Sequence, residues 1–130
     1  MSESNKARAP AGSAADAAAK LHLGGNAMHL LLCVGGKCAP TALQENSWAY
    51  LKTRVRELGL ARAEAGVLRT KADCLRICVD GPIMLIYPEG IWYHGCTPER
   101  IEKILNEHVI GGVPVAEYMF ARAPLLPAGE

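Results

Sequence analysis

Four of the five cysteines in this 130-residue sequence form two close pairs. The first pair is Cys33 and Cys38, separated by Val-Gly-Gly-Lys, and the second is Cys74 and Cys78, separated by Leu-Arg-Ile. Four thiolates can bind a [2Fe–2S] cluster, two on each iron, or one tetrahedral zinc ion. Two disulfides are less expected where thiols stay reduced, and thioredoxin-type exchange needs a Cys-x-x-Cys pair, which the chain lacks.

Each pair follows a segment with the pattern of a buried strand. Met28–Cys33 is an apolar run that leads into the first pair, and Gly66–Ala72 precedes the second. A helix is expected between them over roughly residues 42–58, because apolar residues recur there at helical spacing. A single crossover helix predicts parallel strands, which would bring both cysteine loops to one edge of the sheet and make the four thiolates converge.

The start and the end of this helix have recognisable signals. Thr41 with Gln44 three residues later is a capping-box pattern, and Gly59 suits the position after the last turn.

The second half of the chain predicts a hairpin and a last helix. Pro82–Tyr87 and Ile91–Tyr93 flank Pro88-Glu89-Gly90, which suits a type I turn. Thr97-Pro98 is an N-cap followed by proline at the first helical position. The order is β-α-β-β-β-α, an α/β (α+β) arrangement with helices packed on a mixed sheet, as in the thioredoxin-like fold. Val113–Glu130 has no clear pattern.

Spacing favours iron–sulfur over zinc without excluding zinc. The 35 residues between Cys38 and Cys74 exceed the roughly 15–20 of a common zinc ribbon. A domain of this size can also fold without a structural metal. A zinc-stabilised four-cysteine interaction module therefore stays open as an alternative.

Composition excludes several classes of function. The formal net charge is +1 and no basic patch stands out, so no nucleic-acid partner is expected. No apolar run is long enough to span a membrane, and the N-terminus has no apolar core of a signal peptide, so we expect a cytoplasmic protein. No catalytic set of residues is recognisable, so we expect no enzyme.

Composition also predicts how the chain is divided. We expect a flexible Ala/Gly/Ser-rich tail over residues 1–26, one domain over 27–120 and a Pro-rich tail over 121–130.

Other residues with metal chemistry have simpler interpretations. Cys96 directly precedes the N-cap Thr97 and can pack on Ile101 as a small hydrophobe. Rieske-type ligation by His22, His29, His94 or His108 is not needed, and His108 suits a core histidine because it shares a helix stripe with apolar residues. Gly35 and Gly36 would let backbone N–H groups approach cluster sulfurs.

Two segments resemble the thioredoxin-like [2Fe–2S] ferredoxins. The first is HLLLCVGGKCAPTA followed by a helix ending RELGL, and the second is LRTKADCLRICVDGPIMLIYPEGIWYHGCTPERIEKILNEHVIGG. The resemblance covers roughly Met28 to Phe120. The sequence departs from the family's pattern at Arg76, where a small residue is expected, and at Cys96, where valine or another small apolar residue is more usual.

The resemblance implies a one-electron carrier with one [2Fe–2S] cluster per chain on Cys33, Cys38, Cys74 and Cys78. It also implies a homodimer that exchanges electrons with redox proteins, a donor and an acceptor. An iron–sulfur sensor or a cluster carrier would use the same ligands and remains a further alternative.

Overall fold

The computed structural model describes residues 12–61 and 65–127, which form a five-stranded mixed sheet with strand order β2-β1-β3-β4-β5. Strands β1 and β2 are parallel, as the crossover predicts, and the other neighbours are antiparallel. The strands are β1 Met28–Cys33, β2 Val67–Ala72, β3 Met84–Tyr87, β4 Ile91–Tyr93 and β5 Met119–Arg122.

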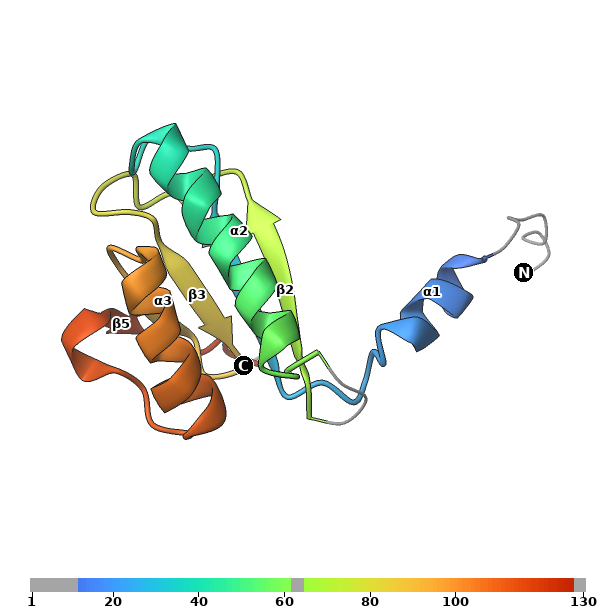
Figure 1. The fold of residues 1–130 in the computed structure, drawn as a ribbon. Coiled ribbons are helices and arrows are strands. Elements are labelled where there is room, and N and C mark those ends of the chain that lie inside the picture. The colour runs from blue at the N-terminus through green and yellow to red at the C-terminus, as the bar shows by residue number, and fades with distance from the viewer. Residues whose placement is uncertain (1–11, 62–64, 128–130) are drawn as a thin grey trace.

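Two helices cover one face of the sheet. Figure 1 shows α2 (Thr41–Glu57) and α3 (Pro98–Ile104) side by side in front of the strands. Helix α3 continues as a π-helical segment, η2 (Leu105–Ile110), and a short 3₁₀ turn, η3 (Ala116–Tyr118), precedes β5. These elements confirm the predicted mixed sheet with helices packed on it. No helix in the described part of the chain is long and apolar enough to cross a membrane.

Alternation along the strands builds the core. Side chains that point to the helices are almost fully buried, because successive strand residues face opposite sides; they include Leu30, Leu32, Met84, Ile86, Ile91 and Tyr93. The opposite face carries Leu31, Leu85 and Trp92, which are aligned across three strands. The core therefore lies between the sheet and the two helices.

The first helix lies apart from this core. Helix α1 (Ala14–Lys20) has no buried residue and projects from the domain in Figure 1. It falls within the tail predicted over residues 1–26, of which residues 1–11 lie outside the described part of the chain, as do residues 128–130 of the predicted C-terminal tail. The domain boundaries remain predictions.

Two predicted local structures are wrong in detail. Helix α2 has Pro40 at its N-cap and no side-chain cap, so Thr41 and Gln44 form no capping box. In the β3–β4 hairpin the Gly90 N–H donates to the Ile86 carbonyl at 2.9 Å, one residue farther back than in a type I turn. By contrast, Thr97 caps α3 as predicted, accepting from the Arg100 N–H at 3.4 Å.

The sequence does not predict strand β5, which lies in the stretch without a clear pattern. Among the strands of residues 12–61 and 65–127 it pairs only with β4, and its residues alternate between half-buried and exposed. An edge strand of four residues with no fully buried side chain leaves little apolar signal in a sequence.

A polar clamp on Glu102 joins the two covering helices. Its carboxylate accepts hydrogen bonds from Arg54 Nε at 2.8 Å, from Tyr50 Oη at 2.7 Å and from Asn106 Nδ2 at 2.9 Å. Hydrogen bonding from Arg54, with that from Tyr50, holds the pKa of Glu102 at about 2, well below its usual range. The ionised carboxylate is therefore the form that ties α3 to α2.

This clamp predicts a specific loss of stability in acid. A carboxyl group with a depressed folded-state pKa stabilises the fold above its unfolded pKa of about 4.3 and stops doing so as the pH falls toward the folded value. Between about pH 4 and pH 2, the thermal midpoint of the wild type should fall more steeply than that of Glu102→Gln. Glu117→Gln, which breaks only the exposed pair with Lys103, is the control and should follow the wild type. Parallel curves for wild type and Glu102→Gln, measured by circular dichroism, would refute the role of the clamp.

Candidate metal centre

The two cysteine loops leave the sheet at the same edge. Cys33 is the last residue of β1, and its partner in the parallel register is Ala72, the last residue of β2. Beyond this pair the Val34 N–H donates to the Ala72 carbonyl at 2.6 Å, so the two loops start together. Cys74 follows two residues later. The parallel pair thus places the cysteine loops as the sequence predicts.

Three of the four sulfurs have close neighbours in this cluster of loops. The Sγ atoms of Cys33 and Cys38 are 2.9 Å apart. A Cβ added at Gly36 would lie 3.2 Å from Cys74 Sγ, which brings the second loop against the first. Cys78 is half-buried in the second loop, and its sulfur makes no hydrogen bond with the described residues. Among the described residues, no three His, Cys, Asp or Glu side chains form a group that could hold one metal ion.

The segment around Gly81 packs against Cys38 of the first loop. Gly81 N–H donates to the Cys38 carbonyl at 2.9 Å, and a Cβ added at Gly81 would lie 2.8 Å from Cys38 Cβ and overlap its sulfur. Only glycine, which has no side chain, fits at position 81 beside Cys38.

Backbone amides point at two of the sulfurs. Ile83 N–H donates to Cys33 Sγ at 3.1 Å, and Arg76 N–H donates to Cys74 Sγ at 3.2 Å. Such donors stabilise negative charge on sulfur. No comparable bond from Gly35 or Gly36 is found in the described residues, so their predicted N–H contact with cluster sulfurs remains a prediction.

Burial keeps Cys33 protonated in the metal-free chain. Its side chain is almost fully buried, and this burial, together with the hydrogen bond to Cys38, raises the pKa of the Cys33 thiol to about 12. A metal that binds Cys33 must therefore displace its proton.

The second loop holds three residues other than glycine in the left-handed region. Arg76, Cys78 and Asp80 have φ values of 74°, 65° and 56°. This conformation costs an L-residue roughly 1–2 kcal/mol, and such strain gathers at functional loops. It also gives a physical reason for the small residue expected at position 76, because glycine adopts this region without penalty.

Cys96 lies in the hydrophobic core and not in either cysteine loop. It is fully buried in the hydrophobic core, which also contains Ile101, as its sequence position predicts. Burial raises the pKa of its thiol well above the usual value. A buried, protonated thiol is chemically inert.

His108 is a satisfied core histidine, as predicted. It is fully buried, its Nδ1 lies 2.8 Å from Tyr93 Oη, and its Nε2 lies 2.5 Å from Glu89 Oε1. Both ring nitrogens are therefore occupied within the fold, and this histidine has no free nitrogen for a metal.

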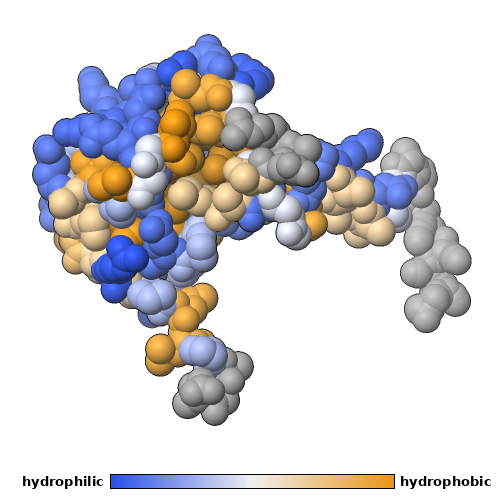
Figure 2. Space-filling model, turned by 90° about the horizontal axis from the view of Figure 1, so that it is seen from below, coloured by the Kyte–Doolittle hydropathy of each residue, from blue (hydrophilic) through white to orange (hydrophobic). Residues whose placement is uncertain are grey.

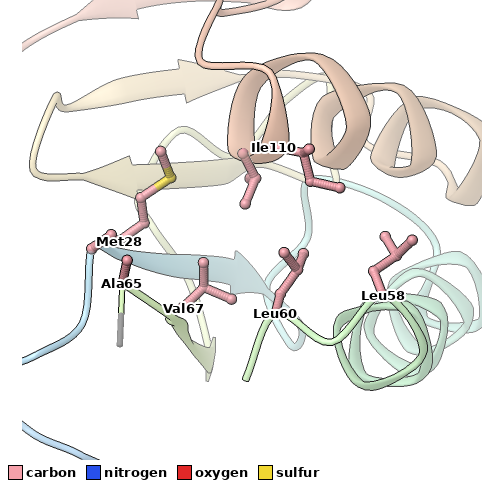
Figure 3. Close-up of a pocket in the computed structure, with 8 residues that line it drawn as sticks. Met28, Leu58, Leu60, Ala65, Val67 and Ile110 are labelled. Carbon is pink, nitrogen blue, oxygen red and sulfur yellow. The ribbon is translucent and has the colours of Figure 1, made fainter. Parts of the chain in front are cut away.

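A hollow lined by residues with apolar side chains lies at the opposite end of the sheet, where β1 and β2 begin. Figure 2 shows apolar side chains gathered on this underside, and Figure 3 shows the hollow itself, which is lined by Met28, Leu58, Leu60, Ala65, Val67 and Ile110. Hydrocarbon and thioether side chains supply neither acid–base groups nor strong metal ligands. The side chains lining this hollow therefore offer no metal-binding site.

Sequence reasoning missed one side chain at this edge. The Gln44 amide Nε2 donates to the Gly36 carbonyl at 2.9 Å and lies 3.6 Å from Cys38 Sγ. The sequence places Gln44 in a capping-box pattern, and its position six residues after Cys38 is the one signal that points to the cysteine loop. The amides of Ile83 and Arg76 could not be found either, because every residue except proline carries an N–H group.

Comparisons with known proteins find relatives of this chain. No protein-family profile matches the chain. It is 31% identical over 88 residues to "Ferredoxin, 2Fe-2S" of Clostridium pasteurianum, covering 65% of this chain and 86% of that protein. A protein of the same designation from Aquifex aeolicus is 26% identical over 102 residues, covering 72% and 89% of the two chains.

The fold agrees as well. The solved structure of a thioredoxin-like [2Fe–2S] ferredoxin from Aquifex aeolicus superposes with a TM-score of 0.64 at 24% identity, covering 79% of this chain and 96% of that one. The fold is therefore thioredoxin-like, as the order of elements predicts. With a relative above 30% identity matched over most of its length, and with two paired-cysteine loops at one sheet edge, this chain belongs to the family of [2Fe–2S] ferredoxins.

Proposed function

We propose that this protein is a one-electron carrier that holds a single [2Fe–2S] cluster on Cys33, Cys38, Cys74 and Cys78. The observation that carries the proposal is the meeting of the two cysteine loops at the edge of the parallel pair β1–β2, with the sulfurs of Cys33 and Cys38 2.9 Å apart. A [2Fe–2S] cluster takes two thiolates on each iron, so it needs ligands in pairs. Ferredoxins are electron carriers rather than enzymes, in agreement with the predicted absence of a catalytic set.

The chain's own groups fit such a cofactor. When bound, the cluster supplies a centre that accepts and releases one electron. The Ile83 and Arg76 amides donate to the sulfurs of Cys33 and Cys74, which favours the thiolate over the thiol. Gly36 and Gly81 leave room where the loops come closest. These residues therefore orient the ligands and stabilise their negative charge.

The zinc-stabilised module makes a different prediction for the same four cysteines. Protein purified without oxygen should be red-brown and contain iron and labile sulfide in equal amounts, with no stoichiometric zinc. A colourless protein with one zinc per chain would support the alternative. A cluster that moves rapidly to an apo-acceptor would instead favour the sensor or cluster carrier, which retains the ligand set.

The close approach at Gly81 predicts a further effect. Gly81→Ala should reduce the iron bound per chain severalfold, because the new Cβ would occupy the space of the Cys38 sulfur. Gly59→Ala is the control: its φ of 68° is strained for alanine, but nothing lies within 4 Å of the new Cβ. We expect it to lower stability by about 1 kcal/mol and to leave the iron content unchanged. Full iron loading of Gly81→Ala would show that the Cys38 sulfur does not sit at this contact in the loaded protein.

Three finer statements belong to the same proposal. The protein acts in the cytoplasm, because ligand thiols must stay reduced. Its partners are redox proteins, a donor and an acceptor.

The protein is also a homodimer in this proposal. Support comes from the rings of Trp92 and Phe120, whose centroids are 6.1 Å apart, and from the exposure of Phe120, which is 44%. Aromatic residues are enriched at such interfaces, and sedimentation of the loaded protein would test the dimer.

A further inference from the structure

Gln44 is a buried amide at the start of α2 whose side chain reaches the first cysteine loop. Its exposed fraction is 0%, and its Nε2 has two neighbours there: the Gly36 carbonyl oxygen at 2.9 Å and Cys38 Sγ at 3.6 Å. An amide nitrogen carries two hydrogens. Gln44 can therefore bond the backbone of the loop and the sulfur of a ligand at the same time.

The Gly36 carbonyl determines which way this amide faces. In the reverse orientation the Gln44 Oε1 atom would face the Gly36 carbonyl oxygen, and two acceptors would meet without a hydrogen between them. The orientation that satisfies Gly36 necessarily presents the remaining N–H toward Cys38. The Oε1 atom then has no hydrogen-bond partner among the described residues, although it is buried.

A buried amide oxygen without a partner is unfavourable, so burial alone does not account for a glutamine at this position. The two bonds of Nε2 do account for it. An N–H aimed at a ligand sulfur stabilises the form with more negative charge, and in an iron–sulfur protein this is the reduced form.

We infer that Gln44 is a positioning residue that holds the Cys38 loop through Gly36 and raises the reduction potential of the centre by donating an N–H to Cys38 Sγ. This inference rests on the proposed function, because it assumes a [2Fe–2S] cluster on the four cysteines. It goes beyond that function by assigning a role to a residue outside the ligand set.

The main test compares the midpoint potential of the loaded wild type with that of Gln44→Met. Methionine has a similar length and no N–H donor. At a fixed ambient potential we expect the ratio of reduced to oxidised protein to fall about two- to tenfold, where tenfold is about 59 mV for a one-electron couple. The signal that reports reduction also shows that a cluster is present. A wild type without a cluster would refute the proposed function and this inference with it, whereas an intact cluster with an unchanged potential in the variant would refute the inference alone.

Ser47 offers a matched control on the same helix. It is fully buried one turn after Gln44, and its hydroxyl has no partner among the described residues. Ser47→Ala should therefore leave the potential unchanged. A Gln44→Met protein with an intact cluster and the potential of the wild type would overturn the inference, as would an equal shift in Ser47→Ala.

A second measurement decides the matter if Gln44→Met does not retain a cluster. Gln44 is the only glutamine in the chain, so protein made by cell-free synthesis from glutamine labelled with ¹⁵N in the side-chain amide, with amide-nitrogen transfer inhibited, carries the label at one site. Pulsed electron paramagnetic resonance of the reduced wild type should then show a ¹⁵N coupling. Its absence would overturn the inference without affecting the proposed function.

Discussion

Replacing Cys33, Cys38, Cys74 or Cys78 with alanine, one at a time, is expected to abolish or badly destabilise the cluster. Each substitution removes one of the four thiolates that two irons require. The remaining ligand of the affected iron cannot hold it alone, so the absorption of the purified protein should fall to a small fraction of the wild-type value. Visible absorption and iron content measured on protein purified without oxygen check this result.

Cys96→Ala is the matched control, since it removes the fifth cysteine. Cys96 is buried in the core and its thiol is protonated, because burial raises its pKa. The substitution should cost on the order of 1 kcal/mol for the lost sulfur and leave the cluster in place. The ligand assignment is wrong if Cys96→Ala loses its colour while one of the other four variants keeps it.

Tyr93→Phe is expected to cause a large loss of stability at a position outside the two cysteine loops. Tyr93 Oη accepts the Val115 N–H at 3.0 Å and lies 2.8 Å from His108 Nδ1. The Glu89 carboxylate faces Nε2 of His108 and can only accept, so the ring proton is assigned to Nε2. Nδ1 is then the acceptor for the hydrogen of the Tyr93 hydroxyl. Burial raises the pKa of Tyr93 to about 12, so the hydroxyl remains a donor at neutral pH.

Removing one oxygen leaves two buried groups without partners. An unpaired buried donor or acceptor costs roughly 1–3 kcal/mol, so Tyr93→Phe should lower the free energy of unfolding by about 2–4 kcal/mol. In urea unfolding followed by circular dichroism, the midpoint should move to lower urea with an unchanged slope.

Tyr118→Phe is the control for this substitution. Tyr118 is half-buried, and the Cζ atom of Arg100 lies 4.4 Å from the centroid of its ring. No hydrogen bond of the Tyr118 hydroxyl is found among the described residues. We expect a change within about 0.5 kcal/mol. Equal effects of the two substitutions would show that the Tyr93 network contributes no special stability.

The sequence predicts the framework of the site well, because its signals are local and strong. The apolar run Met28–Cys33 coincides with β1, and the crossover over α2 predicts the parallel pair that brings the two loops together. Thr97 and Gly59 mark helix ends through short-range chemistry, and Gly59 has the expected positive φ of 68°.

The remaining features depend on tertiary contacts that local patterns do not encode. Gln44 sits where a capping box would use it, but Pro40 occupies the N-cap and the side chain reaches Gly36 instead. Arg76 has a left-handed conformation against the preference of the residue itself, so no local pattern predicts it. The position of the Cys78 sulfur relative to the other three also remains a prediction.

The most direct test of the central claim is an electron paramagnetic resonance spectrum of the protein purified without oxygen and reduced with dithionite. A [2Fe–2S] cluster on four thiolates predicts a spin-half signal that appears on reduction, integrates to one spin per cluster and disappears on reoxidation. A protein that gives no such signal, while its four cysteines hold zinc, would contradict the assignment of an electron carrier.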